Sequence, residues 1–173
     1  DREYYKKALK GESNISDPIH SRLDGSLVIV FTTPIKNRDR IIGALSIAYP
    51  ITFLSEITDK VRLGESGSAF ILDREGYTIA HRDRSLVLSR VNILKTPPDA
   101  GLKKLVEIEG KMIQGEKGAA EYRYEGISKY IGYCPIGDTG WSIGVTAPKT
   151  ELLTELNRVF AIFIELIIFG TFI

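Results

Sequence analysis

Hydrophobic and polar positions alternate with two different periods along the chain, and the period predicts each element. Short runs rich in β-branched and aromatic residues, bounded by Gly, Asp or Pro, are typical of strands. Segments in which apolar residues recur every three or four positions are typical of helices. The predicted strands cover residues 26–33, 41–49, 68–72, 77–80, 119–124, 128–133 and 141–146. The predicted helices cover 4–10, 50 to about 64 and 102–115, and a last helix begins after Pro148.

The order of these elements predicts an α+β fold of two related lobes. Consecutive strands joined by tight turns favour antiparallel sheets. Prolines at 34, 50 and 148 are expected to end strands, because proline has no N–H for the ladder. The segments Ser46–Ile57 and Ser142–Leu156 are similar to each other, each with a strand, a proline and a helix. We therefore expect lobes at 1–61 and 62–148 and an exit helix over 149–173, with loops at 12–22 and 81–100.

The most apolar stretch is the C-terminal end. From Val159 to Ile173 the only ionisable residue is Glu165. A membrane-spanning helix needs about 20 apolar residues, so the pattern favours a truncated transmembrane helix, with the membrane as a partner, over the buried last helix of a soluble domain. The first residues start inside a helical pattern. We expect the lobe at 1–61 to be truncated at its N-terminus and the chain to be a piece of a longer protein.

Composition and charge exclude several classes of function. The 23 basic and 22 acidic residues give a net charge of +1 without a basic block, which argues against a nucleic-acid partner. The single Cys134 rules out an internal disulfide and is expected to be buried. His20 and His81 are far apart in sequence and predict no metal site. Glu107 and Glu109 are interpreted as a solvated helix face. We expect no enzyme activity and no cofactor.

An arginine beside two tyrosines at the start of the chain is the best candidate for binding. The guanidinium of Arg2 can donate two parallel hydrogen bonds to a carboxylate, and Tyr4 and Tyr5 can supply flat walls. A surface arginine next to partly buried tyrosines is the alternative that these residues leave open.

Four segments carry a resemblance to a known family. Arg2–Gly11 is similar to the Arg-x-Trp-Tyr…Ala helix of double Cache sensor domains, and Asp17-Pro18 with the following hairpin resembles the next strands of their membrane-distal lobe. Gly64–Asp73 resembles the opening of the membrane-proximal lobe, and Gly140–Pro148 resembles its last strand. The likeness covers nearly the whole chain. It implies two PAS-like lobes with antiparallel sheets.

The resemblance also implies a function and a set of ligand-binding residues. The domain is expected to be the extracytoplasmic small-molecule sensor of a cell-membrane receptor, first of all a methyl-accepting chemotaxis protein, and to form a homodimer. A histidine kinase, a diguanylate cyclase and an adhesion or protein-interaction module on the same fold are the alternatives. The implied ligand-binding positions are Arg2, Tyr4, Tyr5, Ile19, Ser21 and Ala48. The last three stand where amino-acid-binding members carry Tyr and two Asp. A buried ammonium needs acceptors that these residues lack, so a small carboxylate is expected rather than an amino acid.

Overall fold

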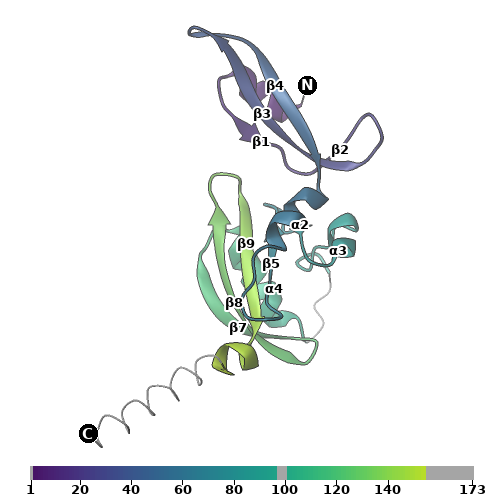
Figure 1. Ribbon diagram of the computed structural model, residues 1–173, viewed down its shortest axis with the longest axis vertical. Coiled ribbons are helices and arrows are strands. Elements are labelled where there is room, and N and C mark those ends of the chain that lie inside the picture. Colours follow the sequence, from purple (N-terminus) through teal and green to yellow (C-terminus); the bar gives the residue numbers. More distant parts are fainter. Residues whose placement is uncertain (1, 97–100, 155–173) are drawn as a thin grey trace, which may run out of the picture.

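The computed structural model describes residues 2–96 and 101–154, which form two antiparallel sheets one after the other along the molecule (Figure 1). The first sheet has four strands from the first 50 residues. The second has five strands in the order β6-β5-β9-β8-β7. Helix α2 (Thr52–Thr58) connects the two sheets. This arrangement confirms the prediction of an α+β fold with antiparallel sheets.

The first sheet is built around one long hairpin. Strands β3 (Leu27–Asn37) and β4 (Arg40–Pro50) pair over their whole length. The two-residue strands β1 (Asn14–Ile15) and β2 (Ile19–His20) both pair with the other edge of β3. The prediction of a loop over 12–22 was therefore wrong, because strands of two residues are too short to show a period in the sequence.

Strand β3 continues past Pro34, which corrects the prediction that this proline ends the strand. Val30 exchanges hydrogen bonds with Ser16 on the side away from β4, so the even-numbered residues of β3 direct their backbone N–H groups to that side. The pairing of β1 with β3 ends at Thr32. The missing N–H of Pro34 therefore falls on an edge where no described strand needs a donor, which is where sheets tolerate proline.

Helix α1 (Glu3–Leu9) packs on the first sheet against β1, β3 and β4. Ala8 is fully buried, whereas Tyr5 and Leu9 are 41% and 46% exposed. Tyr5 and Leu9 therefore lie outside the buried side of the helix. A helix of only seven residues meets the sheet along a narrow stripe, and the small Ala8 side chain allows the close approach.

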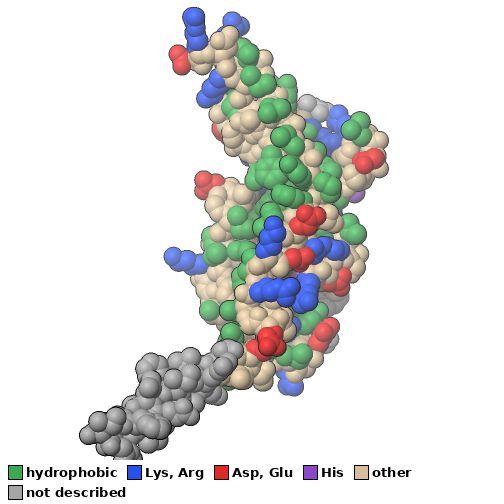
Figure 2. Space-filling view, viewed as in Figure 1, with side chains coloured by type: hydrophobic (Ala, Val, Ile, Leu, Met, Phe, Trp, Pro, Cys, Tyr) green, Lys and Arg blue, Asp and Glu red, His purple; other side chains and the backbone are tan. Residues whose placement is uncertain are grey.

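Hydrophobic side chains are exposed along β4 (Figure 2). Ile42, Leu45 and Ile47 are 62%, 52% and 49% exposed, and no described segment covers them. Exposed apolar patches of this kind mark contact surfaces.

The second sheet agrees closely with the predicted strands. Its members are β5 (Ser68–Leu72), β6 (Thr78–Ala80), β7 (Gly118–Tyr124), β8 (Ile127–Ile136) and β9 (Trp141–Pro148). Helix α4 (Lys103–Ile113) covers one face and buries Ile108 and Met112 against Phe70 and Leu72. Glu109 is also on this buried side, at 6% exposure, which corrects its assignment to a solvated helix face.

A single hydrophobic cluster joins the two sheets. Ile29 of β3 and Leu54 of α2 pack in one cluster with Ile71, Ile79 and Trp141 of the second sheet. Fully burying an aliphatic or aromatic side chain contributes about 1.5–3 kcal/mol relative to exposure. The apolar contact therefore dominates the attachment between the sheets, and polar contacts at its edge add little stability.

Three further local predictions need correction. The segment 81–100, predicted as irregular, contains helix α3 (Arg84–Leu88), which begins because the Asp83 side chain accepts a hydrogen bond from the backbone of Ser85. Helix α2 ends at Thr58 instead of near residue 64. Cys134 is exposed, because Ile131 and Tyr133 on β8 face α4 and side chains alternate along a strand.

The strand that ends at Pro148 is followed at once by a helix, as predicted. The predicted transmembrane segment from Val159 to Ile173 lies outside the described residues. Over 2–96 and 101–154, no helix combines the length and apolarity needed to cross a bilayer.

Candidate functional site

A cavity of about 420 Å³ opens between α1, the short strands and the second sheet. Its walls come from segments far apart in sequence, because α1 lies over β1 while the turn after β5 reaches up to the same point. The lining residues are Arg2, Glu3, Tyr4, Lys7, Asn14, Ile15, Ser16, Asp17, Ile19 and Arg74. Three basic and two acidic side chains therefore surround a space large enough for a small metabolite.

Arg2 lies at the N-cap of α1 with an extended backbone, which turns its side chain toward the cavity-lining strands. The guanidinium Nη2 donates to the backbone oxygen of His20 at 3.3 Å. No other partner of this guanidinium occurs among the described residues. Its remaining N–H groups can therefore serve an anionic ligand, which suits a planar group with several fixed donors.

The six predicted binding residues separate into two groups. Arg2, Tyr4 and Ile19 line the cavity. Tyr5 is exposed on the outer side of α1, and Ala48 is exposed on β4 opposite Val30. Ser21 belongs to the turn after β2, where its hydroxyl accepts from the backbone of Leu23 at 3.2 Å. The structure thus brings three of the six together and places the other three away from the cavity.

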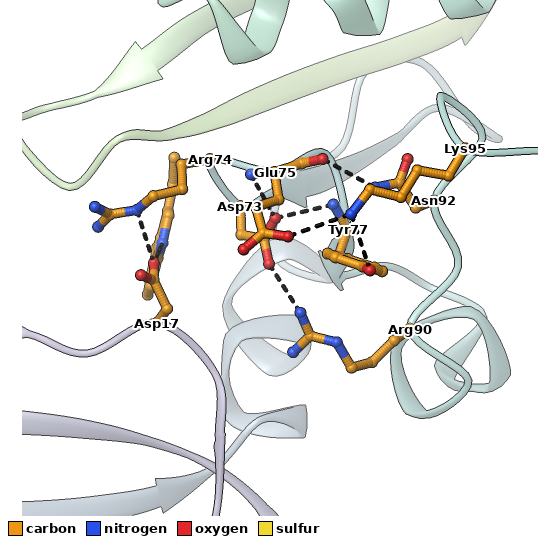
Figure 3. A network of polar contacts seen from close by, with 9 residues as sticks. Asp17, Asp73, Arg74, Glu75, Tyr77, Arg90, Asn92 and Lys95 are labelled. Carbon is orange, nitrogen blue, oxygen red and sulfur yellow. Dashed lines mark hydrogen bonds and ion pairs between the residues drawn. The ribbon is translucent and has the colours of Figure 1, made fainter. Parts of the chain in front are cut away.

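Asp17 is a lining residue that sequence reasoning missed, since the Asp-Pro pair indicated only a turn. Its Oδ1 accepts a hydrogen bond from Arg74 Nε at 3.1 Å (Figure 3). The same oxygen accepts a hydrogen bond from Trp141 Nε1 at 3.3 Å. Arg74 Nη2 also donates to the backbone oxygen of Thr139 at 3.0 Å. Asp17 belongs to the first sheet's loop, whereas its partners belong to the second sheet. The floor of the cavity is therefore also a contact between the sheets.

The turn that carries Arg74 is held by a buried carboxylate. Asp73 is 3% exposed, and its Oδ1 accepts from the backbone N–H groups of Glu75 and Tyr77 at 3.0 and 2.9 Å (Figure 3). Its Oδ2 accepts from Arg90 Nη2 at 3.2 Å, and the Arg90 guanidinium lies 4.3 Å from the centre of the Tyr77 ring. Burial raises the pKa of Asp73, against the hydrogen bonds and the arginine, which lower it. Arg74 thus projects from a fixed turn.

The model of the Cache domain family matches residues 1–156, which is most of the chain. The chain belongs to the Cache domain family. This confirms the resemblance drawn from the Arg2, Gly64 and Gly140 segments.

Known proteins similar to this Cache domain are sensors and receptors. It is 27% identical over 154 residues to the methyl-accepting chemotaxis protein McpA of Bacillus subtilis, covering 88% of this chain and 21% of McpA. The chain therefore spans about a fifth of that protein. The fold matches the extracellular domain of mmHK1S-Z3, a candidate histidine kinase, with a TM-score of 0.64 at 16% identity, covering 91% of this chain and 57% of that one. It also matches the ligand-binding domain of the Pseudomonas fluorescens chemoreceptor CtaA in complex with L-alanine, with a TM-score of 0.60 at 18% identity, covering 87% and 61%.

One sequence motif of this Cache domain is typical of hydrolases but has a structural role here. Gly140–Gly144 reads Gly-x-Ser-x-Gly, the spacing of a hydrolase nucleophile turn. Ser142 instead lies within β9, is 2% exposed, and its hydroxyl donates to the backbone oxygen of Met112 at 2.6 Å. The hydroxyl is therefore a structural contact between sheet and helix α4. Within the described residues, no three His, Cys, Asp or Glu side chains gather as metal ligands.

Proposed function

We propose that this Cache domain is the extracytoplasmic small-molecule sensor of a transmembrane chemoreceptor of the methyl-accepting type. The similarity to McpA supports the receptor class, and the CtaA ligand-binding domain supports a sensor role for this fold. In this proposal residues 1–61 form the membrane-distal, ligand-binding lobe and 62–148 the membrane-proximal lobe. The helix after Pro148 leads to the membrane, and two copies form the signalling dimer.

The proposed ligand is a small metabolite with a carboxylate that binds Arg2. Lys7 and Arg74 add positive charge to the same cavity, and Tyr4 supplies a flat wall. A carboxylate bound to a guanidinium through two hydrogen bonds is among the stronger polar pairs in proteins. L-Alanine, the ligand of the CtaA structure, also carries a carboxylate. The residues at the two predicted ammonium positions, Ser21 and Ala48, lie outside the cavity, which supports a carboxylate as the group that binds there.

The observation that carries the proposal is the position of Asp17 and Arg74. Both line the cavity, and their ion pair connects the first sheet to the second. A ligand carboxylate close to Arg74 competes with Asp17 for the guanidinium. Ligand binding would therefore shift the population between two arrangements of the lobes, and the second sheet would pass the shift through β9 to the helix after Pro148.

Calorimetric titration of the full chain against organic acids and amino acids tests the proposal. We expect an organic acid to bind and Arg2→Ala to weaken it about ten- to a hundredfold, the range for a lost hydrogen bond to a charged group. Lys36→Ala, which removes one positive charge from the exposed hairpin tip, is the matched control and should leave the affinity unchanged. Tight binding that persists in Arg2→Ala would overturn the role of Arg2. If no compound of the panel gave a heat of binding or raised the melting temperature of the chain, a protein-interaction module would be favoured.

The fold match to mmHK1S-Z3 favours one second candidate, the sensor domain of a histidine kinase. Ligand binding is the same in both cases, and the outputs differ. Ligand-dependent phosphate transfer to a histidine of the intact protein would identify the kinase, and ligand-dependent control of a separate kinase would identify the chemoreceptor.

A further inference from the structure

A second cavity, of about 390 Å³, lies inside the lobe of the five-stranded sheet. Residues of α4, α3 and the strands β5 and β7 line it, and it shares no lining residue with the Arg2 cavity. Its inner wall is aromatic, formed by Phe70, Tyr122 and Tyr124. Phe70 and Tyr122 are 8% and 6% exposed, so this wall belongs to the core.

Glu109 is the one carboxyl on the buried side of α4 that lines this cavity. It stands between Ile108 and Met112, at a position where the helical pattern calls for an apolar residue, and is 6% exposed. In the part of the chain that the structure describes, no hydrogen bond or ion pair reaches its carboxyl. Burial raises the pKa of Glu109 from near 4.5 to about 8. A buried carboxyl without a partner is costly unless a ligand supplies the missing charge.

The surroundings of Glu109 favour a cation with an apolar body. The Tyr122 hydroxyl is engaged with Thr146 Oγ1 at 2.8 Å, so its position is fixed and its ring stays against the cavity. Aromatic faces attract cations, most strongly where water is excluded. The carboxyl and the aromatic wall together match an ammonium group attached to a hydrocarbon or aromatic skeleton.

The other charged groups of the cavity limit this ligand to one positive charge. Arg82 and Lys129 line it, and the Lys129 ammonium lies 5.3 Å from the centre of the Tyr124 ring. Asp83 is occupied by the backbone and hydroxyl of Ser85 at 2.9 and 2.7 Å. Burial lowers the pKa of His81, whose Nδ1 accepts from the backbone of Asp83 at 2.9 Å, so it is neutral at pH 7. The positive charges of Arg82 and Lys129 would repel a second ammonium group of a diamine.

We propose that this cavity is a second ligand site that binds a small organic monoamine, with the ammonium paired to Glu109 and the apolar body against Phe70 and Tyr122. The site is separate from the Arg2 cavity, and the inference does not depend on what that cavity binds. It gives the second lobe a ligand chemistry opposite in charge to that proposed for the first.

The test is calorimetric titration of the full chain with 2-phenylethylamine and with its neutral analogue 2-phenylethanol. We expect the amine to bind at least tenfold more tightly than the alcohol. Glu109→Gln keeps the size of the side chain but removes the charge, and should remove this preference. Glu107→Gln changes an exposed glutamate on the same helix and should leave it intact. Arg2→Ala should also leave amine binding intact, which separates this site from the first.

The pH dependence gives a second readout that a structural role of Glu109 would not produce. Amine binding should become about tenfold tighter between pH 7 and pH 9, because Glu109 must lose its proton to pair with the ammonium. His81 titrates below this window, and the pKa values of Tyr122 and Tyr124 are raised above it. Absence of amine binding, equal affinity for the alcohol, or an unchanged affinity and pH profile in Glu109→Gln would each overturn the proposal.

Discussion

Glu151 binds Ser66 through both carboxylate oxygens: Oε2 accepts from the Ser66 backbone N–H at 3.1 Å, and Oε1 accepts from its hydroxyl. The backbone N–H of Glu65 also donates to Oε2, at 3.0 Å. Glu151 stands in the first turn of the helix after Pro148, whereas Glu65 and Ser66 belong to the loop that precedes β5. A side chain at Gly64 would meet Glu151 Oε2 at 2.7 Å, and Gly64 has a φ of +69°, so glycine is needed there. The Glu151 contact thus ties the start of the exit helix to the loop that precedes β5.

The first prediction concerns this contact. Glu151→Ala should speed amide hydrogen exchange at Glu65 and Ser66, because their N–H groups lose their acceptor. The Ser66 hydroxyl and the two N–H groups lower the pKa of Glu151. In the native chain the contact is therefore fully present above about pH 4.5 and is lost as the pH falls through the lower folded-state pKa.

The control for this experiment is Glu65→Gln, which changes an exposed carboxylate in the same loop. It should leave both exchange rates as they are. Equal protection of Ser66 in Glu151→Ala and in the native chain would show that the contact does not hold the loop.

The second prediction concerns the cost of burying Glu109. Its pKa rises on folding from near 4.5 to about 8, so the folded state binds the proton more tightly than the unfolded state. The free energy of unfolding should therefore fall as the pH rises from 4.5 to 8 and then level off. Glu109→Gln should match the native chain at pH 4 and be more stable by a few kcal/mol at pH 8. Urea unfolding at the two pH values measures this, and a Glu109→Gln chain that is less stable at pH 8 would contradict it.

The third prediction concerns the contact between the sheets at Asp17. Both side chains of the Asp17–Arg74 pair are about half exposed, at 45% and 51%. Asp17→Asn removes the ion pair but keeps an acceptor for Trp141, so it should cost less than about 1 kcal/mol. Asp39→Asn at the exposed hairpin tip is the control in urea unfolding. A loss well above this value would mean that the pair is structural and too strong for a ligand to break.

The fourth prediction compares two glycines on neighbouring strands. A Cβ at Gly144 would lie 2.7 Å from ring atoms of Phe70 and 3.1 Å from Ile131, whereas nothing lies within 4 Å of one at Gly132. Gly144→Ala should cost about 1–3 kcal/mol through overpacking, and Gly132→Ala should be close to neutral. Thermal unfolding of the two variants checks this. Similar melting temperatures would show that the Phe70 ring can move away freely.

The elements of the second sheet could be predicted from sequence because each has a period of its own. Strand β9 alternates small and β-branched residues, and the apolar positions of α4 recur at helical spacing. β1 and β2 could not be found in this way, because their conformation comes from pairing with β3. The burial of Glu109 could partly have been predicted, because its position has the helical spacing of the apolar residues Leu105 and Met112.

The candidate site was only partly visible in the sequence. Arg2 and Tyr4 stand together in the chain, and the resemblance to double Cache sensors marks them. Asp17 and Arg74 are 57 residues apart, and their contact depends on how the two sheets pack. No local sequence pattern predicts a contact between residues so far apart in the chain. Tyr5 was predicted as a wall because it is next to Tyr4, but adjacent residues on a helix point in different directions.

The most direct test of the account is the NMR signal of the Trp141 indole N–H during titration with the carboxylate ligand. Trp141 is the single tryptophan of the chain and donates to Asp17 at the floor of the Arg2 cavity, so one resonance reports on the contact between the sheets. We predict that the resonance shifts with ligand occupancy in the native chain and stays fixed in Arg2→Ala. A ligand that saturates the native chain while the Trp141 resonance does not move would contradict a signal that passes through Asp17.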